Sequence, residues 1–69
     1  MTNQINKIRK HYKGCYRITL TGSLFGQVKK DGSTWNAEIR SIESGNIERY
    51  AGIWNTRKEA VEEVKRLAR

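Results

Sequence analysis

Hydrophobic and polar residues alternate along residues 34–40, where Trp35, Ala37 and Ile39 are separated by polar side chains. A period of two is typical of a β-strand that buries only one of its faces. The C-terminal segment has a different pattern, because its apolar residues recur at the spacing of one helix face on a charged background. These apolar residues are Ala60, Val61, Val64, Leu67 and Ala68. We therefore expect a C-terminal helix to cover the apolar face of this strand and to leave the polar face open.

Further strands are expected on either side of this one, in an antiparallel meander. The dipeptide Asp31-Gly32 is a strong signal for a hairpin into the alternating segment. Residues 43–46 have a turn sequence that separates this segment from the last strand. The expected strands are residues 24–30, 34–40 and 47–54, and residues 15–20 are the candidate for an extra strand at the front.

Two local signals complete the expected fold. Gly26 lies inside a strand, where a glycine marks a bulge or the close approach of another part of the chain. Thr56 followed three residues later by Glu59 is a capping box, which predicts that the helix begins there. The fold class is therefore α+β, with a three-stranded antiparallel sheet packed on one C-terminal helix in the order β-β-β-α. Residues 15–69 are expected to form this single domain.

Residues 1–14 are polar and contain Lys7, Arg9, Lys10 and Lys13 without any acidic residue. A segment with so few apolar residues cannot form a stable structure in isolation. We therefore expect residues 1–14 to be a mobile basic arm. The functional interpretation is an arm that lies along the phosphates of a nucleic acid. The alternative is an ordinary frayed terminus.

The charge balance points to a polyanionic partner. The chain has 14 Lys and Arg residues against 7 Asp and Glu residues, for a formal net charge of +7. Such a balance favours nucleic acid first and an anionic membrane second. The first thirty residues contain no acidic residue, so the excess is concentrated in one part of the chain.

Several classes of protein are excluded by what the chain contains. Cys15 is the single cysteine and His11 the single histidine, which rules out a disulfide framework and the usual structural zinc site. No apolar run is long enough to span a membrane, and the start does not resemble a signal peptide. No nucleophile–base pair is evident. We expect a cytoplasmic, nucleoid-associated protein that is not an enzyme and has no cofactor or metal.

One family resemblance covers residues 24–68. The sequences WNAEIR at 35–40, AGIW at 51–54 and TRKEA at 56–60 resemble, in this order, the Apetala-type (ethylene-response-factor) DNA-binding domain. The resemblance implies a three-stranded sheet that lies in the major groove of DNA. It also implies that Arg40 contacts a base or a phosphate, that Glu38 is its partner on the same face, and that Tyr50 is the aromatic residue of the third strand.

Two strands depart from the family pattern. The first strand of the family carries several arginines, where this chain has Gln27, Lys29 and Lys30. Glu48 takes the place of an arginine in the third strand, although Arg49 follows it directly. Lysine binds phosphate as a point charge but does not fork onto guanine as arginine does. The departures therefore affect the expected sequence specificity more than DNA binding itself.

The residues also favour DNA binding without the resemblance. Asn36, Glu38 and Arg40 share the polar face of the middle strand. In the major groove asparagine can pair with adenine and arginine with guanine. The alternative is that they are solvated residues paired across strands. The predicted DNA-binding residues are Gln27, Lys29, Lys30, Asn36, Glu38, Arg40, Arg49 and Tyr50 of the sheet, with Lys7, Arg9, Lys10 and Lys13 of the arm. The expected function is binding of double-stranded DNA as a small transcription or recombination accessory factor.

Two other functions stay open. The strands and the last helix also resemble a double-stranded-RNA-binding domain, which implies that Arg57 and Lys58 contact phosphates across a groove. A small protein-binding module that uses the open sheet face or the helix belongs to a different class. Nucleic-acid binding should weaken strongly with salt, whereas binding of a protein partner should not.

Overall fold

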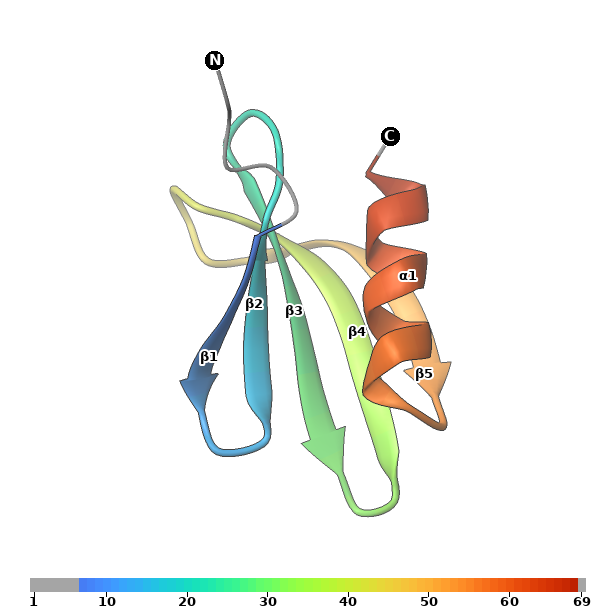
Figure 1. Ribbon diagram of the computed structural model, residues 1–69. Helices are drawn as coiled ribbons and strands as arrows, with labels where there is room; N and C mark the ends of the chain where they lie inside the picture. The colour runs from blue at the N-terminus through green and yellow to red at the C-terminus, as the bar shows by residue number, and fades with distance from the viewer. Residues whose placement is uncertain (1–6, 69) are drawn as a thin grey trace.

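Five antiparallel strands and one C-terminal helix are formed by residues 7–68, the part of the chain that the computed structural model describes (Figure 1). Each strand pairs with the next one along the chain, in the order β1-β2-β3-β4-β5. The elements are β1 Ile8–Tyr12, β2 Cys15–Thr19, β3 Leu24–Asp31, β4 Thr34–Ser41, β5 Ile47–Trp54 and α1 Arg57–Leu67. The α+β class with an antiparallel sheet and a C-terminal helix is confirmed. The expected three strands were too few, because β1 and β2 extend the same sheet.

Strand β1 corrects the expectation of a mobile arm over residues 1–14. Ile8 lies opposite Ile18 and Arg9 opposite Arg17, so this segment is paired with β2. All five residues of β1 are exposed, which removes the apolar alternation that identifies a strand in the sequence. The strand is held by its backbone pairing at the edge of the sheet. Residues 1–6 of the expected arm lie outside the described residues.

The helix packs on one face of β3, β4 and β5 (Figure 1). A Cβ atom at position 26 would lie 2.5 Å from Cγ1 of Val64, which is too close for two carbon atoms. The missing side chain therefore lets the helix approach the sheet closely. The pairing of β3 with both neighbours shows no register shift at this position, so Gly26 marks a close approach rather than a bulge. The buried core is Ile18, Leu20, Val28, Ala37, Ile39, Ala51, Ala60, Val61 and Val64.

The predicted capping box at the start of α1 is confirmed. The backbone N–H of Glu59 donates to the Thr56 hydroxyl at 3.1 Å, and the Thr56 N–H donates to the Glu59 carboxylate at 3.2 Å. Trp35 and Trp54 are partly buried and pack against the core. The indole of Trp54 also donates a hydrogen bond of 2.7 Å to the carbonyl oxygen of Ala51. These contacts fix the chain direction between β5 and the helix.

A bulge in β5 determines which of its side chains reach each face. Ala37 lies opposite Gly52 and Glu38 opposite Tyr50, so Ala51 is an extra residue in β5. Ala51 is buried in the core. Gly52 has a φ of 94°, a conformation that suits glycine at a bulge. The bulge therefore leaves Tyr50 on the face of Glu38, opposite to the helix.

Within residues 7–68, no helix has the length and apolar character needed to cross a bilayer.

Candidate nucleic-acid interface

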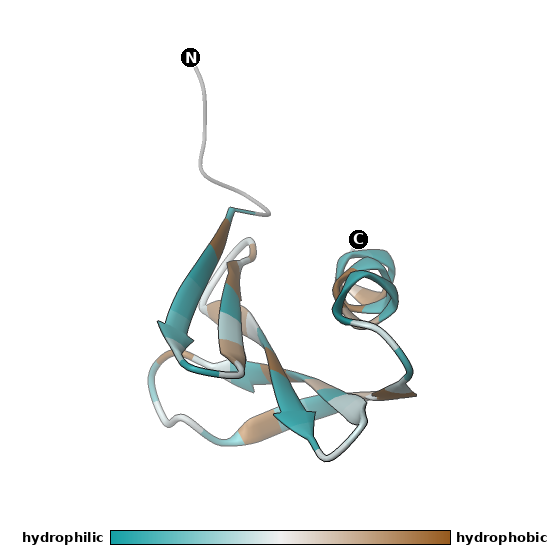
Figure 2. Cartoon of the chain, turned by 60° about the horizontal axis from the view of Figure 1, so that its bottom comes forward, coloured by the Kyte–Doolittle hydropathy of each residue, from teal (hydrophilic) through white to brown (hydrophobic). Residues whose placement is uncertain are grey.

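One face of the sheet carries the helix, and the opposite face, here called the open face, is not covered by any described element (Figure 2). Because cross-strand partners share a face, the strand pairing assigns its residues to three rows across the sheet. The first row is Arg9, Arg17, Gln27, Glu38 and Tyr50; the second is Tyr12, Cys15, Lys29, Asn36 and Ile53; the third is Thr19, Phe25, Arg40 and Ile47.

A hydrogen-bonded group lies at the centre of the open face. Gln27 Nε2 donates to Glu38 Oε2 at 3.0 Å, and Arg40 Nε donates to the same oxygen at 2.5 Å. Arg40 Nη1 donates to the carbonyl oxygen of Gly45 at 2.7 Å. The guanidinium is thus held in one orientation, while its fork provides further N–H donors. The side chain of Arg40 is 29% exposed, so it can contact a ligand on this face.

Two arginines lie side by side on β1 and β2. Arg9 and Arg17 are directly opposite in the register, an arrangement that destabilises a sheet when the charges are alike. The guanidinium carbon of Arg17 lies 4.9 Å from the ring centroid of Phe25, a distance at which cation–π attraction operates. Both arginines line a hollow of about 330 Å³ that has no acidic residue in its lining. An anion bound there would relieve the repulsion between them.

The other end of the open face is apolar. Tyr50 is 73% exposed and Ile53 is 70% exposed, and both line a hollow of about 390 Å³ together with Asn36 and Glu38. Asn36 lies directly opposite Ile53 in the pairing of β4 and β5. The open face therefore changes from cationic at β1 and β2 to amide and apolar at β4 and β5.

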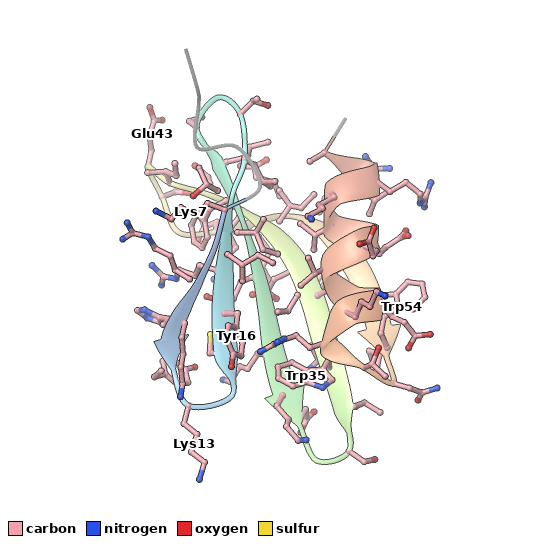
Figure 3. The ribbon with its side chains drawn as sticks, in the orientation of Figure 1. Lys7, Lys13, Tyr16, Trp35, Glu43 and Trp54 are labelled. Atoms are coloured by element: carbon pink, nitrogen blue, oxygen red, sulfur yellow. The ribbon has the colours of Figure 1, made fainter. Side chains whose placement is uncertain are left out.

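The structure brings together most of the predicted site residues. The open face contains Gln27, Lys29, Asn36, Glu38, Arg40, Tyr50 and Arg9. Lys7 lies beside β2, where its carbonyl accepts a 2.9 Å hydrogen bond from the Thr19 N–H. Lys13 projects from the turn between β1 and β2 (Figure 3).

Three predicted residues lie on the helix side instead. Lys30 is opposite Trp35, Arg49 is opposite Ile39, and Lys10 is opposite Tyr16. The prediction included neighbouring residues of one strand, but consecutive side chains of a strand point to opposite faces. The expected placement of Lys30 and Arg49 on the open face was therefore wrong, and Lys10, expected in a mobile arm, is a residue of β1.

Arg17, Phe25 and Ile53 are open-face residues that the sequence reasoning missed. Arg17 precedes the buried Ile18, and this alternation alone would have placed it opposite the core. Ile53 likewise precedes the partly buried Trp54. The alternation was present in both strands, but residues were assigned to faces from it only in the middle one of the three expected strands.

A second hollow lies on the helix side, between β1 and the start of α1. It has a volume of about 600 Å³ and is lined in part by Arg57, Lys58 and Lys65. Trp35 is part of its lining, and the ring centroid of Trp35 lies 6.2 Å from that of Tyr16 (Figure 3). The guanidinium of Arg57 lies 4.3 Å from the Tyr16 centroid, and Lys30 Nζ lies 5.5 Å from that of Trp35.

Two cations on this side, Arg57 and Lys30, are therefore engaged by the protein's own rings. A ring face that is covered by a cation is not free to stack on a base. On the open face the ring of Phe25 is covered by Arg17 in the same way, whereas Arg40 is held by a carboxylate.

Comparison with protein-family models, with curated proteins and with solved structures gives no match for this chain. The functional argument therefore depends on the geometry of the open face.

Proposed function

We propose that this protein binds double-stranded DNA through the open face of its sheet. The observation that carries the proposal is one cation on each of four neighbouring strands, all on the face without a helix. These cations are Arg9 on β1, Arg17 on β2, Lys29 on β3 and Arg40 on β4. A surface of this kind neutralises phosphates and attracts a duplex through release of its counterions.

The spacing of the strands suits a duplex. Neighbouring strands lie about 4.8 Å apart, so Arg17 on β2 and Arg40 on β4 are separated by roughly 10 Å across the sheet. The major groove is about 12 Å wide and admits a β-ribbon. With β3 and β4 in the groove, Arg17 and Arg9 reach the phosphate backbone at one side while Arg40 reaches a base edge.

Arg40 is the residue best placed to read a base. Its orientation is fixed by Glu38 and by the carbonyl of Gly45 before any ligand binds. Because the side chain is already ordered, less conformational entropy is lost when it forks onto guanine. Glu38 acts in this arrangement as the positioning residue. The resemblance to the Apetala-type domain implies the same pair of roles.

An NMR titration with a mixed-sequence DNA duplex tests the proposal. We expect the side-chain amide signals of Gln27 and Asn36 and the Nε–H signal of Arg17 to shift as duplex is added. The indole signals of Trp35 and Trp54 should stay in place, because both rings pack on the helix side. Shifts confined to the indoles and to α1 would contradict binding through the open face.

A second candidate function is binding of double-stranded RNA through the start of α1. It is favoured by the three cations Arg57, Lys58 and Lys65, which line the hollow on the helix side. Such a site would contact phosphates and 2′-hydroxyl groups of an A-form duplex. The same titration with an RNA duplex distinguishes the two functions, because the Trp35 indole and the α1 amides would then shift instead.

In a cell, a module of this size would act as an accessory factor in transcription or in recombination of a mobile element. This part of the proposal rests on the small size of the domain and on its basic open face.

A further inference from the structure

The apolar end of the open face is unexpected on a surface that binds phosphates. Tyr50 and Ile53 are the most exposed of the large hydrophobic residues, at 73% and 70%. Single exposed apolar side chains are common and need no explanation. These two, however, flank one hollow of about 390 Å³ and share it with the amide of Asn36.

The bulge in β5 is what puts both side chains on this face. Tyr50 and Ile53 are three positions apart, so in a regular strand they would point to opposite faces. The extra residue Ala51 restores them to the same face, where Tyr50 lies opposite Glu38 and Ile53 opposite Asn36. Bulges often re-aim a side chain next to a functional site. The strand therefore departs from regular pairing at the point where it presents two apolar groups beside an amide.

We infer that this hollow recognises an A·T base pair in the major groove. The inference rests on the proposed function, because it assigns a base pair to the open face. The major-groove edge of an A·T pair presents N7 and N6 of adenine beside O4 and the C5-methyl group of thymine. Asn36 is able to pair with the adenine, and Ile53, with Tyr50 beside it, contacts the thymine methyl.

The arrangement of the side chains matches this edge. Directly opposite residues of an antiparallel pair have Cβ atoms about 5 Å apart, so the Asn36 amide and the Ile53 methyl groups can contact one base pair. A G·C pair has no methyl group to contact Ile53. Glu38 also lines the hollow, but its carboxylate already accepts hydrogen bonds from Gln27 and Arg40. Its charge is therefore compensated within the protein.

Replacement of thymine by deoxyuridine tests the methyl contact directly. The probes are a duplex of alternating dA and dT and the same duplex with deoxyuridine in place of thymidine, measured by fluorescence anisotropy. Only the C5-methyl group differs between them. Burial of one methyl group predicts that the wild-type protein binds the deoxyuridine duplex about four-fold more weakly.

Two variants assign this difference to Ile53. Ile53→Ala should bind both duplexes equally, because the group that contacts the methyl is gone. Ile53→Ser also lacks both γ-methyl groups, and it serves if the alanine variant folds poorly. Ile8→Ala is the matched control, since Ile8 is an exposed isoleucine on the helix side, opposite Ile18. This control should keep the difference between the two duplexes.

The adenine contact is tested in the same way. Replacement of adenine by 7-deazaadenine removes the N7 acceptor, which is half of a bidentate contact to an asparagine amide. The wild-type protein should bind this duplex about two- to ten-fold more weakly, and Asn36→Ala should show no such difference.

The outcomes separate the inference from the proposed function. Equal binding of the thymine and deoxyuridine duplexes by the wild-type protein would overturn the A·T assignment and leave DNA binding intact. Absence of binding to either duplex would overturn both. If Ile53→Ala retained the difference and instead changed the oligomeric state in sedimentation experiments, the apolar end would be a contact between two copies of the chain, and the inference would be wrong.

Discussion

The two faces of the sheet are built from the same strands but are organised in opposite ways. On the helix side, the packing of side chains determines their positions. Gly26 leaves room for Val64, and the rings of Tyr16 and Trp35 are covered by cations. On the open face, polar contacts determine the positions of the side chains, because Glu38 orients Arg40 and no residue of the core takes part. Stability and binding are therefore carried by alternate residues of the same strands, and single substitutions can separate them.

The same contrast holds for the basic residues. On the helix side Lys30 lies over Trp35, whereas on the open face Arg9 and Arg17 lie opposite one another. Lys30 is therefore held against a ring, whereas Arg9 and Arg17 repel one another. Three sets of variants compare the two faces, and a fourth changes a residue of the helix.

The largest effect is expected from Gly26→Val on the helix side. A Cβ atom at this position already falls 2.5 Å from Cγ1 of Val64, and the additional methyl groups would force the helix away. Overpacking of a core costs about 1–3 kcal/mol, and sometimes more. A domain of this size has a free energy of unfolding of roughly 3–10 kcal/mol. We expect the variant to be strongly destabilised, with a much lower thermal midpoint in circular dichroism.

A double-mutant cycle identifies the cause. Gly26→Ala should be destabilising in the wild-type background, but less so together with Val64→Ala, because the new Cβ then occupies space that the valine left. Gln27→Ala is the control at the next position, whose side chain points to the open face. Its free energy of unfolding should change little. Additive effects of the two core substitutions would show that the helix does not approach the sheet at Gly26.

The second comparison sets Arg40→Ala against Lys65→Ala. Each removes one positive charge, Arg40 from the open face and Lys65 from the helix. Loss of a bidentate base contact costs about 1–3 kcal/mol of discrimination, whereas a distant charge is largely screened at physiological salt. Arg40→Ala should therefore weaken binding of a DNA duplex far more in fluorescence anisotropy.

Arg40→Lys refines this comparison. Lysine keeps the charge but lacks the planar fork, so it should restore little of the lost discrimination between duplex sequences. Equal losses from Arg40→Ala and Lys65→Ala would contradict base recognition by the sheet. A larger loss from Lys65→Ala would move the binding surface to the helix.

Particular residues show which structural features could be predicted from the sequence and which could not. The helix start was predictable because Thr56 and Glu59 form a local motif, and the hairpin at Asp31-Gly32 is equally local. The network around Arg40 was predictable in part, since alternation places Glu38 and Arg40 on one face. Strand β1 was not, because its side chains are all exposed and its stability comes from pairing with β2.

The bulge in β5 could not be predicted from the alternation of apolar and polar residues either. Counted back from Trp54 in steps of two, Tyr50 falls on the core side, and the extra residue Ala51 reverses this assignment. A bulge depends on the pairing of two strands, so a pattern within one strand does not reveal it. The position of Arg49 on the helix side is a consequence of the same pairing.

The third comparison removes two cations from each face. Arg9→Ala with Arg17→Ala changes the open face, and Lys10→Ala with Lys30→Ala changes the helix side by the same charge. The logarithm of the binding constant changes with the logarithm of salt concentration by about 0.9 for each phosphate contact. The arginine pair should make this slope shallower by up to about 1.8, and the lysine pair should change it less. Equal changes in slope would indicate binding through net charge alone.

The smallest effect is expected from Glu63→Gln on α1, where the side chain of Glu63 is 17% exposed. Arg66 Nε donates to Glu63 Oε1 at 2.9 Å, and this hydrogen bond lowers the pKa of the Glu63 carboxyl, with a further contribution from the charges of Arg66 and Arg49. A carboxyl with a lower pKa in the folded state stabilises the protein above its unfolded pKa. That stabilisation is lost as the pH falls through the folded pKa.

The urea midpoint of the wild-type protein should therefore exceed that of Glu63→Gln slightly at neutral pH, and the two should converge in acid. The partner Arg66 is 64% exposed, and ion pairs that water reaches contribute little and are screened by salt. Glu63 belongs to neither the core nor the open face, so affinity for a DNA duplex should stay the same. A difference in midpoint that persisted in acid would mean that glutamine disturbs the helix itself, and a change in duplex affinity would place α1 within the binding surface.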